Sequence, residues 1–196
     1  APARSLPRGP LPYPCGRADQ VPQHVRRRMC SVKSAQTLDD ADRRLLARWA
    51  VACAERVVSL FDADANAQNA IRDAVARTRA YADGDSTAAE EIAKRMQAVT
   101  AAKQATTPAG AAAARSVAQA SAVAHMGAHA LGAAAYAVKA VGLANPDDPQ
   151  AVDAEIRWQI EELTEEERSA LRRLPSLGSD SSGPLGPGLL CRGILG

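Results

Sequence analysis

Two histidines are the residues of this chain whose type and spacing come closest to a known chemistry. His125 and His129 are four positions apart in an alanine-rich stretch. On a helix both side chains would lie on one face, where the pair could chelate a metal ion. The same spacing occurs in the zinc-binding helix of metalloproteases, but there a glutamate follows the first histidine. Met126 occupies that position here, so the catalytic base of such an enzyme is missing.

A longer polar face would surround the pair if residues 109–143 formed one continuous helix. Steps of three and four residues would then place one set of side chains together, namely Ser121, His125, His129, Gly132, Tyr136 and Lys139. Three roles are open for this face: hydrogen bonds that satisfy buried polar groups, contact with a small molecule or partner, and a metal site completed by Cys53 or Glu55. We favour the first role, and we therefore predict no bound metal and no cofactor.

Other catalytic arrangements find little support in the sequence. It contains no phosphate-binding loop, no dinucleotide glycine fingerprint, no nucleophile elbow and no paired-cysteine zinc motif. Glutamates cluster at residues 90–91, 161–162 and 165–167, at expected helix starts and outer faces, where they serve the helix dipole and solubility. Arg56 and Arg72 lie beside apolar stripes, so we expect ion pairs with carboxylates, with anion binding as the alternative. The protein is predicted not to be an enzyme.

The composition indicates how the chain folds. Hydrophobic residues make up 46% of the sequence but aromatic residues only 3%, so alanine, valine and leucine supply most of the apolar surface. Alanine is the best helix former and is depleted in strands. No segment alternates apolar and polar residues over the length of a strand. These features predict an all-α fold, a compact bundle of about five to six helices with a central alanine-rich helix.

Capping residues, prolines and apolar periodicity locate the individual helices. The expected ranges are 37–62, 66–83, 87–105, 109–143, 149–163 and 164–174. Asn66 is the expected N-cap of the second helix and Gly84 lies at its end, and capping boxes open the third and sixth helices, Thr87 with Glu90 and Thr164 with Glu167. The expected inward residues are Ile92, Met96 and Val99 in the third helix and Val152, Ile156, Ile160 and Leu163 in the fifth. Thr37 is the expected N-cap of the first helix, which carries the strongest apolar stripe of the sequence: Leu45, Trp49, Cys53, Val57, Leu60 and Phe61. Together these ranges define a helical domain over residues 37–175.

The segments on either side differ in composition from this domain. Residues 1–36 are rich in proline and arginine and residues 176–196 in glycine, serine and proline, so both are expected to be disordered. Met29 is the first methionine, and one hypothesis is that translation starts there. Cys15, Cys30 and Cys191 fall in these segments, and free thiols are expected.

Charge and hydropathy argue against two classes of partner. The chain has 24 basic and 22 acidic residues and a formal net charge of +2, too balanced to predict binding to nucleic acid or to an anionic membrane. No apolar run approaches the roughly 18 residues that span a bilayer. We therefore expect a soluble, cytoplasmic protein.

Two segments resemble a known family when taken together. Residues 46–57, LARWAVACAERV, and residues 123–140, VAHMGAHALGAAAYAVKA, are similar to the helical domain of immunity proteins from bacterial polymorphic toxin systems, the "immunity protein five-like" family. Residues 70–72, the Trp158–Gln159 pair and residues 171–174 fit the same layout. The resemblance covers residues 38–174.

The resemblance implies a compact helical protein that binds a cognate toxin and blocks it without turnover of its own. The positions that match the family's motifs, with a role in partner binding or in the fold, are Trp49, Cys53, Glu55, Arg56, Arg72, His125, His129 and Tyr136. Two alternatives stay open. One is a metal- or small-ligand-binding helical protein that uses the His125 and His129 face, and the other is a structural or oligomerising helical module.

Overall fold

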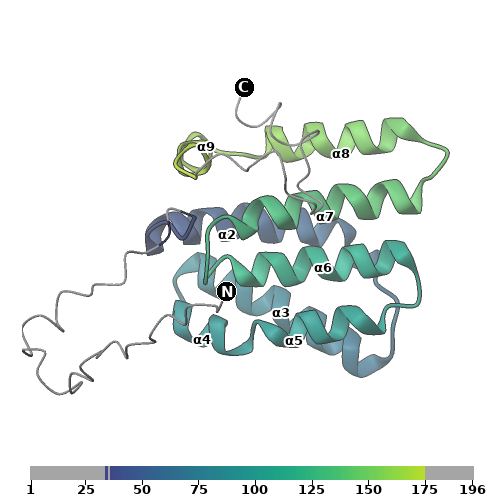
Figure 1. Ribbon diagram of the computed structural model, residues 1–196, viewed down its shortest axis with the longest axis horizontal. Helices are drawn as coiled ribbons and strands as arrows, with labels where there is room; N and C mark the ends of the chain where they lie inside the picture. The colour runs from purple at the N-terminus through teal and green to yellow at the C-terminus, as the bar shows by residue number, and fades with distance from the viewer. Residues whose placement is uncertain (1–33, 35, 175–196) are drawn as a thin grey trace, which may run out of the picture. The chain divides into compact units, whose positions relative to one another are not determined.

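The computed structural model describes Ser34 and residues 36–174 (Figure 1). Their helices are α2 (Asp40–Val57), the 3-10 helix η1 (Val58–Leu60), α3 (Ala65–Asp83), α4 (Ala88–Lys94), α5 (Met96–Ala101), the 3-10 helix η2 (Ala102–Gln104), α6 (Pro108–Ala122), α7 (His129–Ala144), α8 (Pro149–Glu161) and α9 (Glu165–Arg172). The prediction of an all-α fold is confirmed. Apart from Ser34 and Gln36, the expected disordered segments lie outside the described residues, as do Met29, the hypothetical start, and the cysteines at 15, 30 and 191.

Three helices form the centre of the bundle. Helices α2, α6 and α7 pack against one another; α3 also contacts α2 and α6, while α8 covers α7 and α9 contacts α2. Figure 1 shows α3, α4 and α5 on one side of the α6–α7 pair and α8 and α9 on the other. Trp49, 1% exposed, lies in the core. No helix from α2 to α9 is both long and apolar enough to cross a membrane.

The prediction of one continuous helix over residues 109–143 is wrong. The chain leaves the helix after Ala122 and enters α7 at His129, so α6 and α7 form an antiparallel hairpin. Within the turn, the Gly127 amide donates to the Thr37 carbonyl at 3.1 Å, and the next amide bonds to the carbonyl of Gln36. The segment before α2 therefore satisfies backbone groups that the break leaves without helical partners.

The hairpin brings two small-residue surfaces together. Ser116 of α6 donates its hydroxyl hydrogen to the carbonyl oxygen of Ala133 in α7 at 2.7 Å, a bond that requires the two backbones to lie close. A methyl group added at Gly132 would come within 2.6 Å of the Gln119 side-chain oxygen. Close packing of two alanine-rich faces accounts for the break, because each face is covered by the other instead of by separate partners.

Two predicted N-caps are wrong by a few positions. Asp39, not Thr37, caps α2, and its carboxylate accepts from the Asp42 amide at 2.8 Å. Thr37 is engaged through its carbonyl in the α6–α7 turn. Asp64, not Asn66, caps α3 by accepting from the amide of Ala67. In both cases the cap is an aspartate two positions away, whose negative charge also suits the positive end of the helix dipole.

Three other boundary predictions are confirmed. Thr87 and Glu90 form the capping box of α4, and Thr164 and Glu167 form that of α9. Gly84 ends α3 with a φ of 94°, in the left-handed region that favours glycine.

The predicted helix over residues 87–105 is interrupted at Arg95. Its side chain donates to the Ile92 carbonyl at 2.8 Å, the acceptor that a continuous helix would offer to the amide of Met96. Arg95 itself keeps α-helical φ and ψ, and the buried residues Glu91, Ala98 and Ala101 follow one another at steps of seven and three, so the inward face continues through the interruption. Met96 was expected on the apolar inner face with Ile92 and Val99, but its side chain is 56% exposed, whereas the other two are half-buried.

A substitution at Gly110, near the start of α6, tests how closely α6 packs against η1. An added methyl group would lie 2.8 Å from the Leu60 carbonyl oxygen, a backbone atom that cannot rotate away. We expect Gly110→Ala to lower the free energy of unfolding by about 1–3 kcal/mol, although alanine is the better helix former. Gly142→Ala is the control, since its methyl meets only a Val152 methyl at 3.3 Å. Equal urea midpoints for both variants would contradict the close approach.

Candidate functional site

Three of the residues that the sequence singled out lie on one face of α2, where α8 packs against them. Trp49, Cys53 and Arg56 follow each other on one face of α2 at steps of four and three residues. Arg56 Nε donates to Glu155 Oε2 of α8 at 2.7 Å. The Arg56 guanidinium carbon lies 4.0 Å from the ring centroid of Trp158. The arginine is therefore held by a carboxylate and an aromatic face at once.

Gln159 extends this cluster into the core. Its side-chain amide donates to Glu155 Oε1 at 2.8 Å and to the Ala134 carbonyl of α7 at 3.2 Å. Its own backbone carbonyl accepts the indole N–H of Trp49 at 2.9 Å. Glu155 and Gln159 are 3% and 0% exposed, so these polar bonds tie α8 to α2 and α7 where water does not compete.

The chemistry open to this cluster is limited by its burial. Both Glu155 oxygens accept hydrogen bonds within the protein. Burial, and then the charge of Glu155, raise the pKa of the Cys53 thiol well above its usual value. At neutral pH this thiol is protonated and a weak nucleophile. The arrangement is suited to holding helices in register and to presenting Arg56, whose side chain is 40% exposed, at the surface.

The two histidines lie at the α6–α7 turn. His125 is exposed in the turn and His129 begins α7, with ring centroids 6.5 Å apart. The Nδ1 atom of His129 lies 2.7 Å from Gln119 Oε1, an arrangement in which the ring donates to the amide oxygen. Burial, followed by the nearby charges of His125 and Arg95, lowers the pKa of His129 below its ordinary value. This half-buried imidazole is therefore predominantly neutral at pH 7.

The expected polar face around the histidines is not formed. Because the helix breaks between Ala122 and His129, Ser121 belongs to α6 and Tyr136 to α7. Glu55, suggested as a third metal ligand, is ion-paired with Arg79. Among Ser34 and residues 36–174, no group of three or more His, Cys, Asp or Glu side chains is arranged to hold a metal ion.

The remaining candidates are dispersed. Arg72 is exposed on α3, and its guanidinium donates to the Asn69 side-chain oxygen at 2.6 Å. Tyr136 is half-buried on α7 and packs against the core. The structure thus joins Trp49, Cys53 and Arg56 in one cluster and leaves the other candidates outside it.

Two glutamates from the clusters expected at helix starts and on outer faces are buried. Glu91 is 2% exposed; it accepts hydrogen bonds from the Ser121 hydroxyl and, at 3.3 Å each, from Arg77 Nε and Thr78 Oγ1. Glu167, the capping glutamate of α9, is 3% exposed. Glu91 therefore joins α4 to α3 and α6 through polar bonds.

Glu155 was missed because the inward face of α8 was assigned to apolar residues. Ile156 and Ile160 were expected there, but they are half-buried, while Glu155 and Gln159 are buried. The sequence did carry a signal: Glu155 and Gln159 stand at helical steps between Val152 and Leu163. A stripe with apolar ends and a polar middle marks an internal hydrogen-bonding site.

A comparison with known protein families identifies the family of this chain. The family described as "Imm-5 like putative immunity protein" matches residues 36–166, more than half of the chain. The chain belongs to this family. The Imm-5-like match includes the whole of the α2–α8 cluster and both histidines. No curated protein and no solved structure matches the chain.

The Arg56–Glu155 pair should contribute measurably to the stability of this Imm-5-like domain. Arg56→Gln leaves a buried carboxylate without its cation, and we expect a loss of about 2 kcal/mol in the free energy of unfolding, below the usual cost because Arg56 is partly exposed. The double variant with Glu155→Gln should lose less than the sum of the two single variants. The control is Arg79→Gln, which removes an exposed ion pair and should cost under about 1 kcal/mol. If the loss of unfolding free energy in the double variant, measured by urea unfolding, equals the sum of the two single losses, the two side chains do not interact.

His129 should make the stability depend on pH. Its folded-state pKa is lowered from 6.5, so the unfolded state binds the proton more readily and acid favours unfolding. The stabilisation is present above the unfolded pKa and is lost as the pH falls towards the folded value. Between pH 7.5 and 5.5, His129→Gln should lose less stability than the wild type, while His125→Gln keeps most of the dependence because burial is the main cause. Parallel pH profiles for wild type and His129→Gln would contradict this assignment.

Proposed function

We propose that this protein binds a cognate bacterial toxin in the cytoplasm and neutralises it by occupancy, without turning over a substrate. The observation that carries the proposal is membership of the Imm-5-like family over residues 36–166. A polymorphic toxin system is the setting in which such a protein would act.

The side-chain chemistry of the described residues supports inhibition by binding. In the α2–α8 cluster both carboxylate oxygens of Glu155 and the side-chain NH₂ group of Gln159 are committed to bonds within the fold, and Cys53 is held as a protonated thiol. Such committed groups stiffen the domain. A rigid binder loses less conformational entropy on association, which favours a tight complex.

The proposal predicts stoichiometric protection. Cells that express the toxin encoded beside this gene should grow when the protein is co-expressed. In a purified assay of the toxin's activity, inhibition should saturate at about one equivalent, because each protein molecule occupies one toxin molecule. A catalytic antidote would instead protect at far lower ratios, and either that result or an absence of any protection would overturn the proposal.

A further inference from the structure

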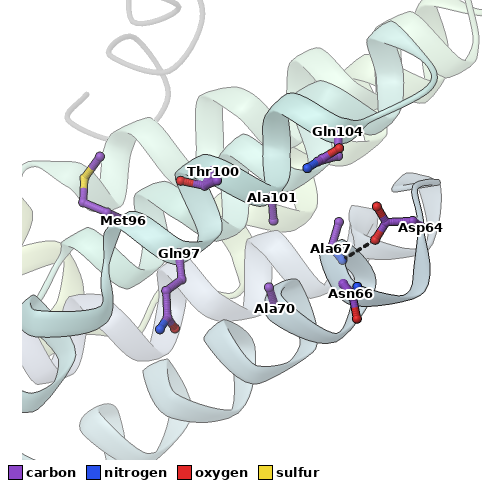
Figure 2. Close-up of a pocket in the computed structure, with 9 residues that line it drawn as sticks. All are labelled: Asp64, Asn66, Ala67, Ala70, Met96, Gln97, Thr100, Ala101 and Gln104. Carbon is purple, nitrogen blue, oxygen red and sulfur yellow. Dashed lines mark hydrogen bonds between the residues drawn. The ribbon is translucent and has the colours of Figure 1, made fainter.

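A groove between α3 and α5 is a surface feature suited to contact with another protein. It has a volume of about 500 Å³. Its base is made of small side chains, Ala67 and Ala70 from α3 and Ala101 from α5. Figure 2 shows the two helices side by side, with Met96 at one end of the groove and Asp64 and Gln104 at the other. Ala70 is partly exposed in this row, while Ala67 and Ala101 are buried where α3 meets α5.

The walls of the groove carry unused hydrogen-bonding groups. Asn66, Gln97, Thr100 and Gln104 line it, and none of these four side chains is hydrogen-bonded to another described residue. Figure 2 accordingly shows a single bond in the groove, from the Ala67 amide to the Asp64 carboxylate. Amide side chains both donate and accept, as the peptide backbone does. An apolar base with several convergent polar groups is typical of a recognition site.

The two ends of the groove differ in chemistry. Met96, at one end, is 56% exposed, and only Leu143 among the other large apolar side chains of the described residues is also exposed, at 44%. A flexible, exposed methionine suits contact with an apolar side chain. Asp64, at the other end, is the only ionisable residue of the lining, and it makes no ion pair within residues 36–174. This end attracts a cation.

We propose that the α3–α5 groove receives an extended segment of the cognate toxin, with a Lys or Arg at the Asp64 end and an apolar side chain at the Met96 end. This inference rests on the proposed function and names the contact surface. Residues 96–104 of the groove wall extend about 13 Å at the helical rise of about 1.5 Å per residue. An extended chain advances about 3.3 Å per residue, so the segment is about four residues long. Amide walls pair with its backbone, and the alanine base admits its side chains.

The experiment measures the affinity of the full-length protein for the toxin encoded beside its gene, by isothermal titration or biolayer interferometry. Ala70→Phe fills the groove and should weaken binding at least tenfold. Its matched control is Ala76→Phe, an exposed position on another face of the same helix, which should bind as the wild type does. Circular dichroism and thermal melting check that both variants fold.

Two further variants avoid the core altogether. Met96→Ser should weaken binding several-fold, whereas Leu143→Ser, at the other exposed apolar side chain, should not. Asp64→Asn should also weaken binding and reduce its dependence on salt, because asparagine still caps α3 but carries no charge. The control is Asp153→Asn, which removes an exposed charge on α8 and should leave binding unchanged.

The possible results separate this inference from the proposed function. If the wild type binds and neutralises the toxin but the groove variants bind as tightly as their controls, the groove is not the contact surface while the proposed function stands. If the wild type does not bind the toxin, both fail. If Ala70→Phe instead dissociates a dimer of the protein, seen by light scattering, the groove serves self-association and the inference is wrong.

Discussion

The close approach of α6 and α7 is the constraint on which the rest of the structure depends. Only residues with little or no side chain allow the hydroxyl of Ser116 to reach the Ala133 carbonyl across the seam. Once this hairpin forms, α2 can pack against both of its helices, and the outer sides of the pair are covered by α3 and α8. The same hairpin decides where the histidines lie, because His125 falls in the turn and His129 becomes the first residue of α7.

Alanine seams leave little to define which face of an outer helix points inward, since one small side chain packs much like another. Directional polar bonds supply that specificity in this protein. Glu155 and Gln159 fix α8 through Arg56 and the indole of Trp49, and Glu91 fixes α4 through Ser121. A buried carboxylate is expensive unless it is paired, so a slipped helix would leave it unpaired. These bonds discriminate against wrong registers more than they add net stability.

Sequence reasoning succeeded where a local signal decides the outcome. The all-α class followed from alanine content, the end of α3 from Gly84, and the start of α9 from the Thr164 capping box. It failed where tertiary contacts decide. The break before His129 contains no proline. Its amides donate to the carbonyls of Gln36 and Thr37, about 90 residues earlier in the chain, and no local sequence pattern predicts such a contact.

The candidate site could likewise be predicted only where local periodicity decides. The α2 face with Trp49, Cys53 and Arg56 followed from helical periodicity, and the resemblance led to the family that the comparison confirms. The partners Glu155 and Gln159 come from a helix about 100 residues away, and only their three-dimensional pairing shows that they belong to the cluster. The α3–α5 groove escaped the sequence analysis because Met96 was assigned to the inward face, whereas Glu91, Ala98 and Ala101 form that face and leave Met96 exposed.

The most direct test of this account is a distance across the hairpin. Spin labels at Arg115 of α6 and Lys139 of α7, both exposed, can be introduced as cysteines in a background with serine at positions 15, 30 and 191, and measured by pulsed electron resonance. The account predicts a short distance, because packed helices lie about 8–10 Å apart. A distance of about 36 Å, the length of 24 residues in one continuous helix, would contradict it.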